Sequence, residues 1–161
     1  MALSKIQAES MNLADTYAFS GTVSGAGVSG KILNTYISGQ WNGTINSSSY
    51  MDLTNNSITL TPVSSSSKFF ITIRSEGTQN NGTNNGGFQV LRDTTVIGGS
   101  GCYGNPGGAR AIMPMGFNNI DSPNTASQIV YKVQWQTRNG GGLGTADYGA
   151  VGNMVIMEIS S

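Results

Sequence analysis

One segment of the chain, residues 127–137, alternates between two kinds of side chain with a period of two. Its odd-numbered positions are apolar and its even-numbered positions are mostly polar: Ile129, Tyr131, Val133 and Trp135 against Val130, Lys132, Gln134 and Gln136. Because successive side chains of a β-strand point to opposite faces, this pattern predicts a strand with one buried face. A single strand cannot stand alone, so the segment requires a sheet built from other parts of the chain.

Shorter runs of the same kind recur between turn residues. Strands are predicted over residues 32–37, 44–50, 57–61, 68–74, 88–92, 95–97, 109–117, 127–137 and 154–159. A hairpin turn is expected at Asp93-Thr94, and Pro114 predicts an edge or bulged strand. Eight or nine strands separated by turn signals predict an all-β fold, a jelly-roll-like antiparallel β-sandwich.

The charge content excludes several other classes. Only 10% of the residues are charged, against about 25% in an ordinary soluble domain, which is too few to cover the outer faces of a helix bundle. Eight basic and eight acidic residues cancel, and no two basic residues are adjacent. The chain therefore has no basic patch for nucleic acid or for an anionic membrane. No segment approaches the ~18 apolar residues of a transmembrane helix.

The residues that usually carry catalysis or bind metals are scarce. The chain has no histidine, the commonest general base and metal ligand. Its single cysteine, Cys102, allows no intrachain disulfide and no multi-cysteine zinc site, and is interpreted as an unpaired thiol. We therefore expect no enzymatic activity, no cofactor and no metal site. Calcium held by loop carbonyls stays open as an alternative.

The carboxylates follow no recognisable catalytic motif. A glycosidase needs two of them about 5 to 10 Å apart, and any such pair here would be non-local in sequence, so a carbohydrate-active enzyme is a remote alternative. Asp52, Asp93 and Asp121 are interpreted as turn residues. The full set is Glu9, Asp15, Asp52, Glu76, Asp93, Asp121, Asp147 and Glu158.

The first thirty residues differ from the rest of the chain. They are rich in glycine and small residues, with apolar residues every two to four positions from residue 17 onward, so they cannot bury a core of their own. We predict an N-terminal attachment arm over residues 1–30 and a β-sandwich domain over residues 31–161. The start has no apolar stretch typical of a secretory signal, which predicts synthesis in a cytoplasm. The arm residues expected to bind a partner are Ile6, Leu13, Tyr17, Phe19 and Val23.

Several predicted strands are apolar on both faces. A sandwich needs only one apolar face per sheet, so a second apolar face requires a cover. A sister subunit is the economical cover, which predicts a homo-oligomer. The residues concerned are Phe69 with Phe70, Ile112 with Met113, and Ile156 with Val155 and Met157.

Four aromatic residues lie among small polar residues in the predicted loops and turns. Exposed rings of this kind stack on sugars, whereas buried ones pack over the ends of a sandwich or in a subunit interface. Both interpretations stay open. The residues are Trp41, Tyr50, Tyr103 and Tyr148, and the loops expected to present glycan-binding residues are 76–87, 98–108 and 139–152.

Four motifs in order carry a family resemblance. They are Ser57-Ile-Thr-Leu-Thr-Pro62 with the serine-rich run to Lys68, the strand ending at Arg92, Tyr131-Lys-Val-Gln134, and Met157-Glu158-Ile159. Together they resemble bacteriophage tail-fibre-like and other virion-surface β-sandwich proteins, notably of marine phages. The segment from Leu3 to Gly25 is similar to the N-terminal attachment segments of such proteins.

The resemblance implies a trimeric β-sandwich displayed on a virus particle, without catalytic residues. It implies a homotrimer that contacts other virion proteins through its arm, with binding of host surface carbohydrate left open. It also implies a virion location, with release from the host cytoplasm by lysis. The chain lacks the shaft or repeat region of longer tail fibres, so a capsid decoration protein is the alternative.

Overall fold

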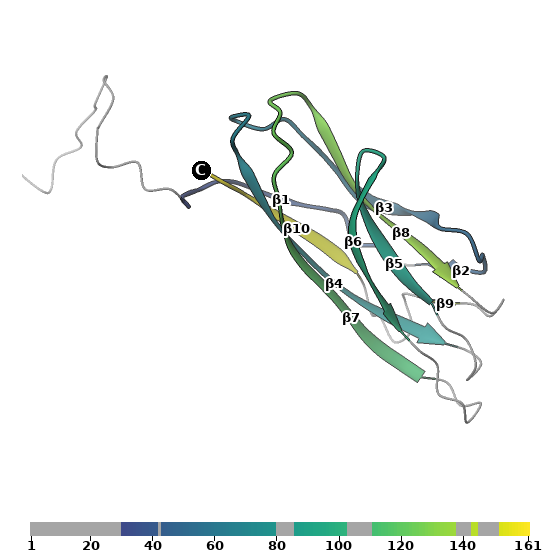
Figure 1. Ribbon diagram of the computed structural model, residues 1–161. Coiled ribbons are helices and arrows are strands. Elements are labelled where there is room, and N and C mark those ends of the chain that lie inside the picture. The colour runs from purple at the N-terminus through teal and green to yellow at the C-terminus, as the bar shows by residue number, and fades with distance from the viewer. Residues whose placement is uncertain (1–29, 42, 80–85, 103–110, 138–142, 145–151) are drawn as a thin grey trace, which may run out of the picture.

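A computed structural model of the protein describes residues 30–41, 43–79, 86–102, 111–137, 143–144 and 152–161. In these ranges ten strands form two antiparallel sheets (Figure 1). No helix among the described residues is long and apolar enough to cross a membrane. The strands are β1 (Ile32–Ile37), β2 (Thr44–Ile45), β3 (Met51–Leu60), β4 (Lys68–Gln79), β5 (Gly86–Arg92), β6 (Thr95–Cys102), β7 (Ala111–Asp121), β8 (Ile129–Thr137), β9 (Leu143–Gly144) and β10 (Asn153–Ile159).

The eight longer strands pair like one long hairpin that has been rolled up. Strand β5 pairs with β6, β4 with β7, β3 with β8, and β1 with β10. The pairs β10–β4 and β5–β8 then join these hairpins sideways. The β4 sheet has the order β1-β10-β4-β9-β2, with β7 on the other side of β4, and the β8 sheet has the order β3-β8-β5-β6. This nesting is a jelly roll, so the predicted jelly-roll-like antiparallel β-sandwich is confirmed.

The core lies between the inner faces of the two sheets. All five odd-numbered residues of β8 are buried, as its alternation predicts. Phe69 of β4 reaches across to Tyr131 of β8, with ring centroids 5.9 Å apart, and Phe88 of β5 packs beside Trp135 at 5.2 Å. These four rings are almost fully buried; the Phe69–Tyr131 contact joins the two sheets, whereas Phe88 and Trp135 are neighbours within the β8 sheet.

Two glycine-rich stretches predicted as loops are partly strand. Strand β4 continues to Gln79, β5 begins at Gly86, and β6 continues to Cys102. The glycines are compatible with strand here because the β5 and β6 backbones lie very close together. A side chain at Gly99 would collide with the carbonyl of Phe88 on the neighbouring strand. The prediction of a loop over 98–108 is therefore wrong for residues 98–102.

Strand β3 is longer than predicted, and the predicted strand over 44–50 is shorter. Only Thr44–Ile45 forms β2, whereas β3 begins at Met51. The extension passes through a bulge between Asp52 and Ser57, at which Asn55 has a φ of 63°. Asparagine tolerates this left-handed backbone better than most residues, so Asn55 can lie inside a strand.

The hairpin and edge-strand predictions agree with the structure. Strands β5 and β6 join through Asp93-Thr94, with Asp93 at a φ of 53°. Within the described residues, β7 pairs with β4 alone, so Pro114 lies in an edge strand as expected.

Candidate interaction face

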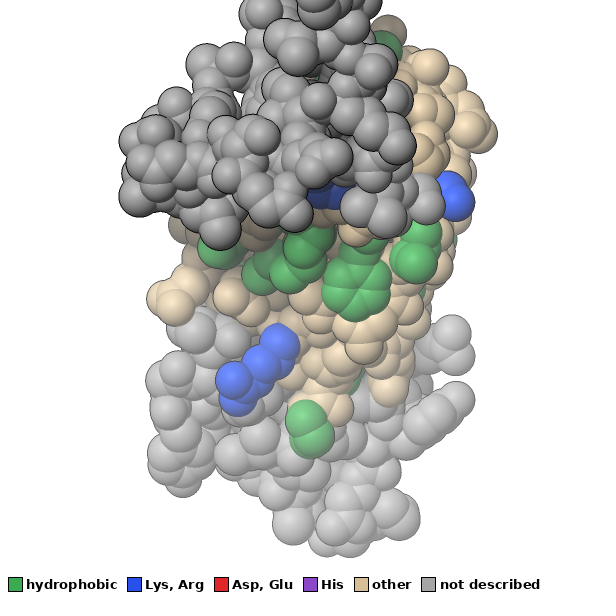
Figure 2. Space-filling view, turned by 90° about the vertical axis from the view of Figure 1, so that its left-hand side faces the viewer, with side chains coloured by type: hydrophobic (Ala, Val, Ile, Leu, Met, Phe, Trp, Pro, Cys, Tyr) green, Lys and Arg blue, Asp and Glu red, His purple; other side chains and the backbone are tan. Residues whose placement is uncertain are grey.

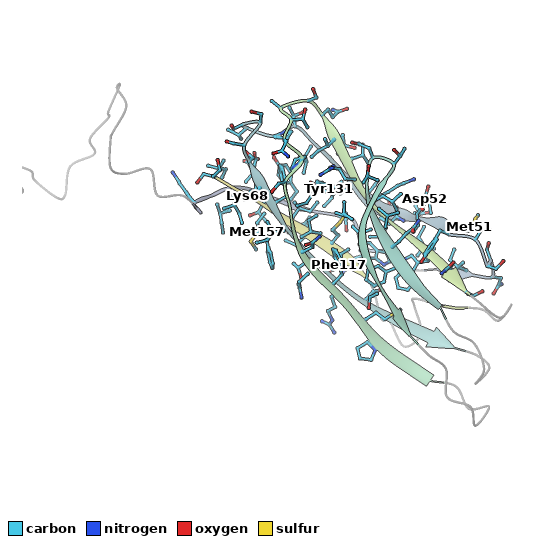
Figure 3. The ribbon with its side chains drawn as sticks, in the orientation of Figure 1. Met51, Asp52, Lys68, Phe117, Tyr131 and Met157 are labelled. Carbon is cyan, nitrogen blue, oxygen red and sulfur yellow. The ribbon has the colours of Figure 1, made fainter. Side chains whose placement is uncertain are left out.

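The outer faces of the two sheets differ in chemistry. The β8 sheet turns polar side chains away from the core, as a sandwich face exposed to water should. Gln89 donates a hydrogen bond to Gln134 at 2.8 Å, and Lys132 pairs with Asp52 at 3.2 Å. Figure 3 shows Asp52 on this side of the molecule, far from Met157 on the opposite side.

The outer face of the β4 sheet is apolar instead. Registers across the sheet place Met157 beside Phe70, and Phe70 beside Ile120. Val155 lies beside Ile37 in the same way. Figure 2 looks onto this side and shows a band of hydrophobic side chains across it. We call this surface the apolar face; its residues are Ile32, Ile37, Phe70, Ile120, Val155, Met157 and Ile159.

The apolar face is partly exposed to water in a single copy of the chain: three isoleucines are exposed, and the other members are half-buried. Its most exposed members are Ile37 at 66%, Ile120 at 57% and Ile32 at 53% of their full accessible surface. Moving one such side chain from full exposure to full burial is favourable by about 1.5–3 kcal/mol of free energy. Contiguous exposed hydrophobic residues of this kind mark contact surfaces. The predicted second apolar face is therefore present, on strands β1, β10, β4 and β7.

Charged groups on the same side of β4 are cationic between residues 68 and 74. Lys68 lies beside Ile159, and Arg74 lies beside Asn153 and Gly116. Lys and Arg side chains flank the hydrophobic band in Figure 2. The central positions between them, Thr72 and Asn118, are uncharged. A partner of this face thus meets apolar and uncharged polar side chains, with basic groups at positions 68 and 74.

A buried carboxylate lies on the inner side of the same sheet. The side chain of Glu158 accepts hydrogen bonds from the Asn34 amide at 2.9 Å and from the backbone amide of Val63 at 2.6 Å. The Tyr36 hydroxyl donates a longer bond of 3.4 Å. Burial alone raises the pKa of Glu158, but these bonds and one from Ser67 lower it below its ordinary value. Glu158 thereby ties β1 and the β3–β4 connection to β10.

A second polar group joins the two sheets. Asp121 at the end of β7 accepts two hydrogen bonds from Arg92 of β5, at 2.6 and 2.8 Å, and one from the Tyr131 hydroxyl at 2.6 Å. Burial and the adjacent Asp121 carboxylate raise the pKa of Tyr131. The prediction that Asp121 and Asp52 are turn residues is wrong, since both belong to strands, whereas Asp93 does form a turn and accepts a bond from the Val130 amide.

The predicted glycan-contacting aromatics are not brought together as a described site. Trp41 is fully buried, and its backbone bonds with Gly152 in both directions. The expectation that Trp41 contacts glycan is therefore wrong, and its packing at the end of the sandwich follows the alternative interpretation. Tyr50 is exposed, next to the start of β3. Tyr103 and Tyr148 lie outside the described residues.

The predicted partner-binding residues of the arm also lie outside the described residues: Ile6, Leu13, Tyr17, Phe19 and Val23. Cys102 ends strand β6. The described ranges hold no group of three or more carboxylate, cysteine or histidine side chains placed to bind a metal ion.

The sequence missed part of the apolar face. The doubly apolar strands around Phe70 and Met157 were recognisable from alternation, but Ile37 and Ile120 were not. Their strands alternate weakly, and only the register with β10 and β4 places them beside Val155 and Phe70.

Comparison with known proteins leaves the family open. No protein-family model matches the chain, and no curated protein matches it. Among solved structures, the chain is similar to the PRD1 vertex protein P5, with a TM-score of 0.46 and 14% sequence identity. The match covers 81% of this chain and 100% of that chain. At this similarity the two chains share too little for a role to pass from one to the other.

Proposed function

We propose that the protein is a non-enzymatic structural subunit of a bacteriophage particle, built to associate with copies of itself as a homotrimer. The single observation that carries the proposal is the apolar face. A jelly roll that folds as a monomer needs only the inner faces of its sheets to be apolar. The polar outer face of the β8 sheet supplies the internal contrast, because both faces belong to the same domain. The four ordered sequence motifs support the virion assignment and the trimer.

The polar groups inside the domain serve its architecture. Glu158 accepts four hydrogen bonds from groups of the same chain, counting the one from Ser67, and Asp121 accepts three. Both carboxylates stand between strands that they hold together. A rigid scaffold of this kind suits a subunit that must hold its shape on a particle outside the cell.

Two positions on the particle fit such a subunit. One is a tail-fibre-like appendage or fibre tip, anchored by the N-terminal arm. Its loops would carry the glycan-binding residues, of which the exposed Tyr50 is a candidate. The other is a capsid decoration protein that stabilises the head. An appendage is present in a few copies per particle, whereas a decoration protein repeats over the whole capsid lattice.

Labelled antibodies raised against the purified chain test the proposal on intact particles of the phage that encodes it. Label at the tail, with few copies by gel densitometry, supports the appendage. Label over the head, with many copies, supports decoration. A chain found only in the lysate and never on purified particles would contradict a structural role in the virion.

A further inference from the structure

The N-terminal segment contains a second strand-like pattern that matches the apolar face. From residue 12 to residue 24 the even positions are all small or polar. The odd positions carry the large apolar residues. In extended backbone these odd side chains share one side. The odd positions are Leu13, Asp15, Tyr17, Phe19, Gly21 and Val23.

The two surfaces agree in chemistry as well as in pattern. The segment offers four large apolar side chains to a face that exposes Ile37 and Ile120. Its charged residue on that side is Asp15, and the charges beside the apolar face between residues 68 and 74 are those of Lys68 and Arg74. The opposite signs of Asp15 and Lys68 favour contact between the segment and this face.

The segment is also long enough and suitably attached. Eleven extended residues span roughly 36 Å, more than the seven residues of β10. The amide of Gly30 donates to the Ser160 carbonyl, and the amide of Ser160 donates to the Lys31 carbonyl. The chain is therefore paired with the residue that follows β10 as far back as Gly30, which lies where the strands of this sheet end. Six residues of composition Ser-Gly-Ala-Gly-Val-Ser separate that point from Val23.

We propose that residues 13–23 of one copy lie on the apolar face of an adjacent copy. This rests on the proposed function, since it requires association of identical chains. The position of Gly30 favours a neighbour: Gly30 is paired with Ser160, beyond the last residue of β10, so a segment that covers the sheet of its own copy has to turn back within the six-residue spacer. Exchange of an identical element between subunits is a low-cost route to an oligomer.

Disulfide trapping in the full chain tests this arrangement. In a Cys102→Ser background, one differently tagged chain carries Gly21→Cys in the segment and the other carries Thr72→Cys in the centre of the apolar face. A disulfide needs the two Cα atoms within about 7 Å, so a bond forms only where segment and face meet. The matched control replaces Thr72→Cys by Gln134→Cys, on the polar face of the β8 sheet. Circular dichroism and light scattering of each reduced sample establish folding and mass.

The proposal predicts a mixed disulfide dimer of the two tagged chains for Gly21→Cys with Thr72→Cys, and none for Gly21→Cys with Gln134→Cys. A chain carrying both Gly21→Cys and Thr72→Cys that closes only within itself would overturn it, since the segment would cover its own sheet. A trimer without the mixed disulfide would overturn it while leaving the proposed function intact. A monomeric parent chain would overturn both together.

Discussion

Met157 and Phe70 lie side by side across the β10–β4 ladder, with both side chains on the side of the sheet that faces away from the core. Their neighbours in sequence, Ile156 and Phe69, are fully buried on the other side. Strand β10 and the adjoining part of β4 are therefore apolar on both faces, and only the inner face is needed to fold the domain.

Replacing Phe70 and Met157 with serine should weaken self-association while leaving the fold in place. Each side chain gains about 1.5–3 kcal/mol on full burial, so partial burial of both in an interface predicts at least a tenfold loss in association constant. Sedimentation velocity over a concentration series measures the change. The matched control, Gln89→Ser with Gln134→Ser on the polar face, should leave association unchanged. Equal effects of the two double variants would rule out the apolar face as the contact.

The hydrogen bonds to Glu158 predict a pH-dependent contribution to stability. Its pKa is lower in the folded chain than the ordinary value of 4.5, so the folded state favours the ionised form. The stabilisation is therefore fully present above the unfolded pKa and is lost as the pH falls through the folded pKa. We expect Glu158→Gln to lower the free energy of unfolding by about 1–3 kcal/mol at pH 7, because a glutamine side chain cannot accept all of the hydrogen bonds that the carboxylate accepts.

Urea unfolding at several pH values measures this difference. The gap between the parent chain and Glu158→Gln should narrow below pH 4.5, because the parent loses the stabilisation that the variant lacks. A gap that stays constant down to pH 2 would show that ionisation of Glu158 does not contribute to stability.

The Asp121 group and the surface pair on the β8 sheet should respond differently to the same change. Asp121→Asn leaves Arg92 without its carboxylate partner between the sheets, and removing a partly buried charged acceptor costs about 1–3 kcal/mol. Asp52→Asn removes the exposed pair with Lys132, a pair of the kind worth about 0–1 kcal/mol. Thermal unfolding of both variants checks the order. If Asp52→Asn lowers the unfolding temperature as much as Asp121→Asn does, the Arg92–Asp121 contact between the sheets contributes no more to stability than an exposed ion pair.

Gly152 is required by the packing of Trp41. A side chain at Gly152 would collide with the Trp41 indole, whereas one at Gly116 would meet the Ile73 carbonyl at an ordinary 3.7 Å. Gly152→Ala should therefore destabilise the chain by about 1–3 kcal/mol through overpacking, while Gly116→Ala stays within about 0.5 kcal/mol. Chemical denaturation of the two variants compares them directly, and similar stabilities would mean that Trp41 repacks freely.

Much of the fold could be predicted from local alternation, because period two identifies strands and their buried faces. Strand β8 and the hairpin at Asp93 follow that rule. The failures share one physical cause: pairing partners distant in sequence decide the outcome. Asn55 lies inside a strand because a bulge accommodates it, and Gly99 does so because β5 approaches closely.

The same reason limits what the sequence reveals about the contact surface. Phe70 and Met157 signal a second apolar face by themselves, whereas Ile120 joins it only through the register of β7 with β4. Trp41 looks like an exposed loop aromatic by composition, and only its bridge to Gly152, more than a hundred residues away, buries it.

The mass of the full-length chain in solution tests the central claim most directly. Size-exclusion chromatography with light scattering at micromolar concentration should give three times the 16.8 kDa of one chain. A mass of one chain would contradict the account, because the apolar face would then remain open to water with no copy to cover it.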